Sequence, residues 1–146
     1  MNLDEQELPH IIVGALMEVH SQLGPGLALD AYKECLAYEL GMREILFVRD
    51  QPGTVNYKGR ELDAAFTMDF VVEDMVILHL YAAELEELHK KILKNHLRLS
   101  GLEIGFLVNF NAPELRKGGL KRLIVSTEEP ALRWKEVDEK GDKRRK

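Results

Sequence analysis

The chain has 146 residues, of which 45% are hydrophobic and 31% are charged, and its formal net charge is −5. This length and composition fit one globular domain and exclude a chain that is disordered throughout. No apolar run approaches the roughly 20 residues of a membrane helix, and the acidic start of the chain does not resemble a signal peptide. The single cysteine, Cys35, excludes an internal disulfide, so we expect a protein of the reducing cytoplasm with no membrane segment.

Charge is distributed unevenly along the chain. Residues 133–146 hold seven Lys or Arg and four Asp or Glu, a net +3, which leaves −8 on residues 1–132. We therefore predict one domain over residues 1–132 and a charged, disordered tail over 133–146, with Trp134 as the last residue able to anchor the chain to the core. Affinity for nucleic acids comes largely from phosphate neutralisation, so the acidic body disfavours nucleic acid as a partner.

The first third of the chain predicts two helices. Apolar residues recur at helical spacing over residues 7–23, and Gly24-Pro25-Gly26 ends that helix. His20, near its end, is interpreted as a structural residue. A second helix is expected over residues 27–40, burying Leu29, Leu36 and Leu40 with either Tyr32 or Ala37. Tyr38, like Tyr32, is interpreted as a core residue whose hydroxyl lies at a boundary.

The middle of the chain predicts strands. Two short ones are expected over residues 45–49 and 54–58. The most strand-like stretch, Thr67 to Ala83, reads as two strands joined by a tight turn at Glu73-Asp74. Asp69 interrupts the first of these strands. His79 and Tyr81 stand two apart in the second, so both side chains point to the same face of the sheet.

The remaining elements alternate between helix and strand. A helix is expected over residues 83–99, with His89 and His96 on or beside its apolar stripe and His89 in a structural role. That stripe is predicted to contain Leu85, Leu88, Ile92 and Leu99. The almost continuous apolar run at 104–110 predicts a central strand, and 123–126 an edge strand. A strand, a helix and a strand in succession imply a parallel pair with a right-handed connection.

Several phrases resemble the small bacterial GxxExxY proteins, over about Pro9 to Ile124. They include Ile11-Ile12-Val13-Gly14-Ala15, Leu23-Gly24-Pro25-Gly26-Leu27, Ala31-Tyr32, Tyr57-Lys58-Gly59 and Gly105-Phe106-Leu107-Val108-Asn109-Phe110-Asn111. The resemblance implies an α/β, restriction-endonuclease-like fold with a mixed sheet of about four to five strands flanked by helices. It also implies PD-(D/E)XK nuclease chemistry, in which acidic residues hold Mg²⁺ and a lysine helps to orient the attacking water.

The nuclease motif is largely replaced in this sequence. Mapped through the resemblance, Asp69 matches the first aspartate, but the Glu-x-Lys pair falls on His79 and Tyr81. The helical glutamate falls on Leu29, and the Gln and Tyr of the later helix fall on Ile92 and His96. With one carboxylate left and no cation at the Tyr81 position, Mg²⁺ is disfavoured. We therefore expect no catalytic residues, and we interpret six positions as vestigial: Leu29, Asp69, His79, Tyr81, Ile92 and His96.

Three functional hypotheses follow. The first is a non-catalytic relative, without a cofactor, whose cleft binds a protein or a small ligand, or whose copies assemble into a homo-oligomer. The second is a Zn²⁺ or Fe site made by Asp69, His79 and His96, because imidazole and carboxylate groups suit those metals better than Mg²⁺. The third is nucleic-acid binding, or residual metal-dependent nuclease activity. Its basic residues would be those of the tail together with Lys90, Lys91, Lys94 and Arg98.

Overall fold

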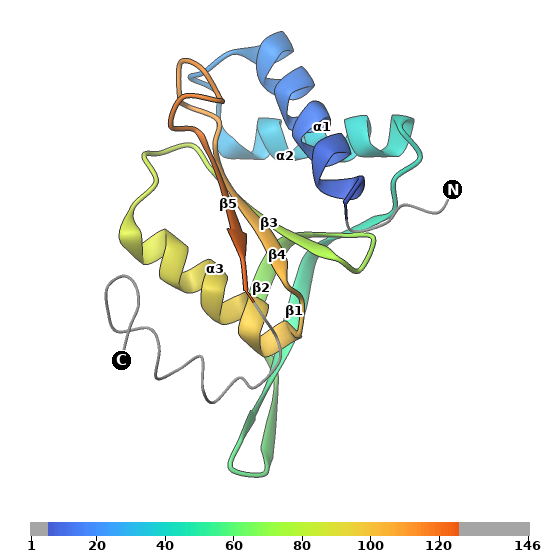
Figure 1. The fold of residues 1–146 in the computed structure, drawn as a ribbon, viewed down its shortest axis with the longest axis vertical. Helices are drawn as coiled ribbons and strands as arrows, with labels where there is room; N and C mark the ends of the chain where they lie inside the picture. Colours follow the sequence, from blue (N-terminus) through green and yellow to red (C-terminus); the bar gives the residue numbers. More distant parts are fainter. Residues whose placement is uncertain (1–5, 126–146) are drawn as a thin grey trace.

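The computed structural model describes residues 6–125, which form helices on both faces of a five-stranded sheet (Figure 1). In chain order the elements are α1 (Leu8–Leu23), α2 (Leu29–Met42), β1 (Phe47–Tyr57), β2 (Arg60–Val72), β3 (Val76–Tyr81), α3 (Glu87–Ser100), β4 (Ile104–Asn109) and β5 (Leu120–Ile124). The predicted α/β class with a mixed sheet is confirmed. The predicted domain end at 132, the tail 133–146 and Trp134 lie outside the described residues.

The strands lie in the order β1-β2-β3-β4-β5. All neighbours are antiparallel except β3 and β4, whose parallel ladder runs from Val76 opposite Ile104 to Tyr81 opposite Asn109. Helix α3 connects these two strands. The prediction of a unit made of a strand, a helix and a second, parallel strand is therefore confirmed. The predicted turn at Glu73-Asp74 also exists, and both residues have a positive φ. The last strand begins at Leu120, three residues earlier than predicted, and ends at Ile124.

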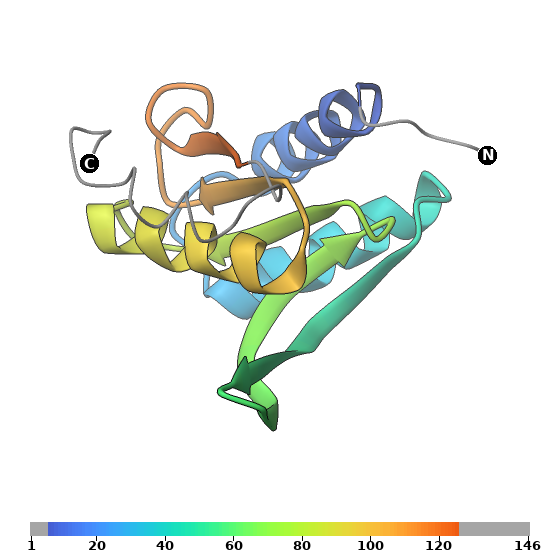
Figure 2. The same ribbon diagram turned by 60° about the horizontal axis from the view of Figure 1, so that its bottom comes forward.

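Two hydrophobic clusters lie on opposite faces of the sheet, and Figure 2 shows α3 in front of the sheet and α2 behind it. The larger cluster joins α1 and α2 to one face. It includes Leu16, Leu36, Phe70, Leu78, Phe106, Val108 and Phe110. The smaller cluster lies under α3 and consists of Met68, Val71, Ile77, Leu93, Leu97 and Leu107. No helix within residues 6–125 combines the length and the apolar character needed to cross a bilayer.

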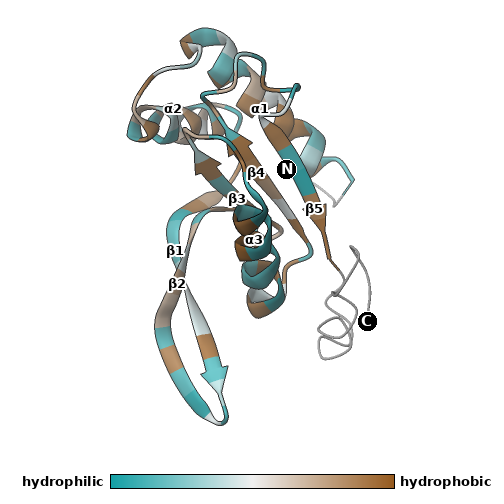
Figure 3. Cartoon of the chain, turned by 90° about the vertical axis from the view of Figure 1, so that its left-hand side faces the viewer, coloured by the Kyte–Doolittle hydropathy of each residue, from teal (hydrophilic) through white to brown (hydrophobic). Residues whose placement is uncertain are grey.

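Strands β1 and β2 form a long hairpin whose far half extends away from the body (Figure 3). The prediction of two short strands at 45–49 and 54–58 is therefore wrong, since one strand spans both. The ladder shifts register between Gly53 and Val55, which lets the strand continue past Pro52. Gly53 is required there because the ring of Phe66 lies across it and leaves no room for a Cβ atom.

Helix α3 presents a different face to the sheet from the one predicted. Its buried residues are Leu93 and Leu97, whereas Leu88 is 61% exposed and Leu85 precedes the helix. The predicted stripe of Leu85, Leu88, Ile92 and Leu99 is therefore wrong. Leu93 faces the sheet because Gly105 on β4 has no side chain, and a Cβ there would meet the Leu93 side chain at 2.8 Å. A close contact with the sheet thus selects the buried face of the helix.

The two N-terminal helices match their predicted positions to within two residues. Of the two alternatives in α2, Tyr32 is the fully buried one, and its hydroxyl donates to Gly24 O at 2.5 Å. Tyr38 is 71% exposed, so its assignment to the core is wrong: it lies on the outer side of α2. His20 is buried and its Nε2 lies 2.8 Å from the carbonyl oxygen of Ala112, a contact that ties α1 to the loop before β5.

Candidate functional site

The site begins where β2 and β3 separate. These strands pair only over Phe70–Val72, so Asp69 is the first residue beyond the ladder on the side of the hairpin. Its Oδ2 atom accepts a hydrogen bond from the backbone N–H of Leu80 at 2.9 Å. The carboxylate thus takes the place of a backbone carbonyl at the end of the ladder. The position of Asp69 is set by strand pairing, and the polar group is satisfied there.

A lysine that the sequence analysis did not single out lies beside this carboxylate. Lys33 Nζ, from α2, is 3.8 Å from Asp69 Oδ1, and both side chains are mostly buried. The sequence analysis considered a cation only at the Tyr81 position and found none. It therefore missed the positive charge that Lys33 supplies from α2. A signal existed, because Lys33 lies four residues after Leu29 and therefore on the same helix face. Leu29 is the position at which the resemblance places the helical glutamate.

On the other side of Asp69 the structure brings two histidines together. His79 is 4% exposed, and its Nδ1 lies 3.7 Å from Asp69 Oδ2, which is longer than a hydrogen bond. Its Nε2 lies 2.9 Å from His96 Nδ1, which is a hydrogen bond between β3 and α3. Asp69, His79 and His96 therefore form a continuous polar chain from the end of the β2–β3 ladder to α3.

Aromatic rings border this chain. The ring of Phe66, on β2, stacks on His96 with centroids 4.5 Å apart. Tyr81 stacks on His89 at 4.2 Å, and His89 Nδ1 also accepts the backbone N–H of Glu86 as part of the capping box that begins α3. His89 thus has the structural contacts expected of it. Tyr81 turns toward the terminus of α3 and stacks on His89 instead of on the histidine pair.

The other two positions that the sequence predicts to be vestigial carry no polar atom into the site. Leu29 packs against the larger hydrophobic cluster, and Ile92 is a half-buried apolar residue of α3. Of the six positions, the structure therefore joins three, Asp69, His79 and His96, into one polar chain. Lys33 joins this chain from α2.

Burial and neighbouring charges act in opposite directions on the carboxylate. Burial raises the pKa of Asp69, but the His79 imidazole, the backbone N–H of Leu80 and the Lys33 ammonium outweigh it and hold that pKa below its usual value. Asp69 is therefore ionised at neutral pH. Burial, and then the negative charge of Asp69, raise the pKa of the Tyr81 hydroxyl, so Tyr81 is a neutral phenol.

His96 is held in its neutral form. Burial, and then the neighbouring His79, lower its pKa to about 4, although the negative charge of Asp69 opposes both. The carboxylate beside His79 Nδ1 favours a proton on that nitrogen. The hydrogen bond between the two rings then holds a single proton between His79 Nε2 and His96 Nδ1.

These donors do not fit Mg²⁺, the ion that the family resemblance implies. Mg²⁺ requires about six oxygen ligands in octahedral geometry, usually including one or two carboxylates. Here one carboxylate is present, and a lysine ammonium is already beside it. Within residues 6–125, no group of three His, Cys, Asp or Glu side chains is placed to hold a metal. The hypothesis of a Zn²⁺ or Fe site uses Asp69, His79 and His96 as ligands. In the structure the facing nitrogens of His79 and His96 form a hydrogen bond with each other, and Asp69 lies beside the other nitrogen of His79.

The basic residues of the nucleic-acid hypothesis lie on α3. Lys90 Nζ is 3.1 Å from Glu87, and Arg98 donates to Asn95 at 2.6 Å. Lys91 and Lys94 are exposed. These contacts are typical of a solvated helix face, on which oppositely charged and polar neighbours pair locally.

Comparison with known proteins places the chain in a family. The family model of the PD-(D/E)XK nuclease superfamily matches residues 6–123. Comparisons with curated proteins and with solved structures give no match. The mixed five-stranded sheet flanked by helices is consistent with a restriction-endonuclease-like fold. The chain belongs to the PD-(D/E)XK nuclease superfamily.

Proposed function

We propose that this chain is a non-catalytic member of the superfamily that acts by binding a protein, a small ligand or another copy of itself. One observation carries the proposal: both carboxylate oxygens of Asp69 are engaged within the protein. Oδ2 accepts the N–H of Leu80, and Oδ1 faces the ammonium of Lys33. The nuclease position with the matching acid is thus part of an internal polar network.

A divalent cation is electrostatically disfavoured at this position. It would have to approach one carboxylate that already faces a positive charge at 3.8 Å. Within residues 6–125, Asp69 belongs to no group of three His, Cys, Asp or Glu side chains placed to hold the ion. Replacing the Glu-x-Lys pair by His79 and Tyr81 removes the anionic ligand and the cation that the chemistry uses. The remaining oxygen donors are too few for a hard cation.

The histidine pair is also poorly suited to activating a water molecule. A general base works best when its pKa lies near the working pH. The pKa of His96 is about 4, so the neutral ring has little tendency to take up a proton at pH 7. His79 is almost fully buried and is occupied by Asp69 on one side and His96 on the other.

A nuclease assay tests the proposal. We expect the purified full chain to leave single- and double-stranded DNA and RNA intact with Mg²⁺ or Mn²⁺. Asp69→Asn, prepared in parallel, is the matched control: it keeps the size of the side chain and removes its charge, so equal traces of cleavage in both preparations identify a contaminant. Cleavage by the natural chain that Asp69→Asn abolishes would overturn the proposal.

One observation favours a second candidate, a transition-metal site. His79 and His96 converge, and Asp69 lies behind the outer nitrogen of His79, as carboxylates do behind metal-binding histidines. A Zn²⁺ ion would replace the shared proton and complete its coordination with water. Bound metal in the purified chain, or a rise in melting temperature with Zn²⁺ that His96→Gln removes, would support this candidate. An unchanged melting temperature would eliminate it.

A further inference from the structure

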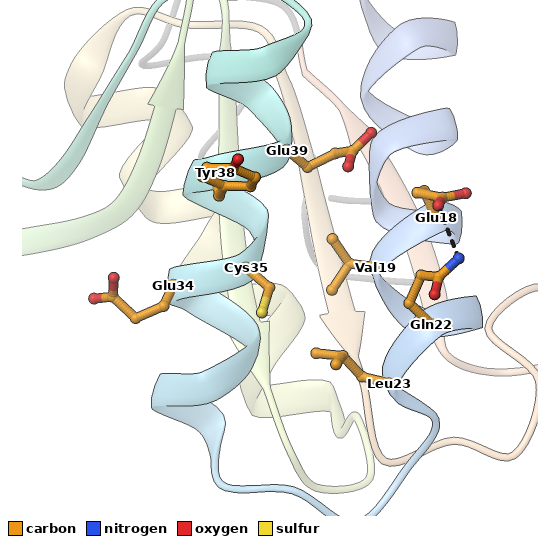
Figure 4. A pocket seen from close by; sticks show the side chains of 8 residues that line it. All are labelled: Glu18, Val19, Gln22, Leu23, Glu34, Cys35, Tyr38 and Glu39. Carbon is orange, nitrogen blue, oxygen red and sulfur yellow. Dashed lines mark hydrogen bonds between the residues drawn. The ribbon is translucent and has the colours of Figure 1, made fainter.

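A groove of about 420 Å³ lies between α1 and α2, and neither Asp69 nor the two histidines of its network line it. Figure 4 shows Val19 and Leu23 extending from α1 toward α2, with Cys35 facing them. Tyr38 lines the same groove. A volume of this size is within the range of natural sites that accept large apolar groups. The described part of the chain leaves the groove unfilled.

The outer side of α2 next to this groove carries exposed apolar residues. Cys35, Tyr38 and Met42 follow the i, i+3, i+7 spacing and share one helix face. Tyr38 is 71% exposed and Met42 is 57% exposed, and Leu46, four residues after Met42, is 73% exposed. Within residues 6–125, no segment covers these side chains. Aromatic residues and methionine are enriched in the cores of protein interfaces.

We propose that a second copy of this chain occupies the groove. The two α2 helices pack antiparallel about a two-fold axis, and Met42 of each copy enters the groove of the other beside Cys35. In this arrangement Tyr38 of one copy lies against Met42 of the other, a favourable contact between a sulfur atom and an aromatic ring. A two-fold interface needs both the groove and the group that fills it on one surface, and α2 supplies both. The inference adds to the proposed function and uses none of the residues around Asp69.

Charge complementarity favours a second copy over an uncharged apolar partner. Three lining residues of the groove are acidic, Glu18, Glu34 and Glu39, and none of its described lining residues is basic. The carboxylate of Glu34 already pairs with Arg49 of its own chain at 2.8 Å, so the acidic rim next to α1 consists of Glu18 and Glu39. Met42 is followed by Arg43, so the copy that inserts Met42 brings a guanidinium group to this acidic rim. Arg43 already binds Glu39 of its own chain at 2.7 Å. At the two-fold axis, the Arg43–Glu39 pairs of the two copies would lie next to each other, with each guanidinium group near the carboxylate of the other copy. This arrangement stabilises both pairs.

The first test measures the oligomeric state of the full chain. Light scattering and sedimentation equilibrium at about 100 μM are expected to give a dimer. We expect Met42→Glu to weaken dimerisation by at least roughly tenfold, as loss of a central interface residue does. Leu88→Glu is the matched control, because Leu88 is similarly exposed but lies on α3, and it should dimerise like the natural chain.

The second test traps the interface and does not depend on how well a charged variant folds. In Met42→Cys, oxidation by diamide takes two electrons and two protons from two thiols. We expect a covalent dimer linking Cys35 to the new cysteine, which Cys35→Ala abolishes. The bond cannot form within one chain, because seven helical residues span about 10.5 Å, beyond the reach of a disulfide. Leu88→Cys should give no such Cys35-dependent dimer.

Two results would overturn this inference. One is a natural chain that is monomeric at about 100 μM while Met42→Cys fails to cross-link. The other is a dimer that Met42→Glu leaves unchanged, which would place the interface elsewhere. Neither result bears on nuclease activity, so failure of the dimer and failure of the non-catalytic assignment are distinguishable.

Discussion

The two faces of the central sheet are built differently. The face covered by α1 and α2 buries a large cluster that is apolar throughout. The face covered by α3 buries six apolar residues, and the chain of Asp69, His79 and His96 lies beside them. Polar groups are thus concentrated where the apolar layer is thin and one short helix provides the cover. This fold can therefore carry a charged network at one margin of the sheet without disturbing its main core.

Strand geometry explains why the network lies at that margin. The pairing of β2 with β3 ends at Phe70, so the sheet opens at Asp69 and leaves backbone groups for side chains to satisfy. On the opposite face the strands remain covered by two helices, and any polar side chain there would need its own buried partner. His79 and His96 therefore meet on the α3 side of the sheet, whereas Lys33 reaches Asp69 from α2.

The largest effect is expected from truncating one leucine on each face. Leu16 on α1 and Leu97 on α3 are both fully buried. Leu16→Ala should reduce the free energy of unfolding by about 4 kcal/mol, and Leu97→Ala by about 2.5 kcal/mol, because the thinner layer can relax and admit water. Urea denaturation at pH 7 measures both values. Equal losses would mean that the two layers are equally well packed, contrary to the comparison.

A smaller loss is expected from removing the carboxylate at the sheet margin. Asp69→Ala leaves the N–H of Leu80 without its acceptor and Lys33 without its counter-charge, at a cost of about 2 kcal/mol. Asp69→Asn keeps an acceptor oxygen and should lose only about 1 kcal/mol. The same denaturation experiment distinguishes them. If both variants matched the natural chain, the network would contribute nothing to stability.

The smallest effect should appear as a dependence on pH. The pKa of His96 is about 4 in the folded chain and about 6.5 when unfolded, so between these values only the unfolded chain takes up the proton. Stability is therefore complete above pH 6.5 and falls as the pH drops toward 4, by about 1 kcal/mol because the ring is partly hydrated.

The control for this pH dependence is His96→Phe, which keeps an aromatic ring against Phe66 but cannot titrate. The difference in free energy of unfolding between pH 7 and pH 5 should be smaller in the variant than in the natural chain. A variant with the same pH dependence would assign the effect to other groups, such as His79 or the carboxylates.

Local patterns predicted most of the secondary structure but failed where packing selects among alternatives. Residues 83–99 contain more apolar positions than one helix face can bury, and the pattern alone favoured the wrong set. The contact of Leu93 with Gly105 decided the face. In the same way, the sequence indicated two short strands at 45–49 and 54–58. In the structure β1 runs through both, with a register shift between Gly53 and Val55 and the ring of Phe66 packed over Gly53.

For the candidate site, the sequence by itself indicated the superfamily, which the family model confirms, and predicted that Asp69 is retained and that its partners are replaced by His79 and Tyr81. Residue identity and spacing along one element carry that information. Only the tertiary structure decided what surrounds Asp69. Lys33 and His96 come from helices far away in sequence, and their approach depends on how α2 and α3 pack on the sheet. Contacts between elements depend on packing that no local spacing encodes, so the carboxylate became part of a closed network only once the chain was folded.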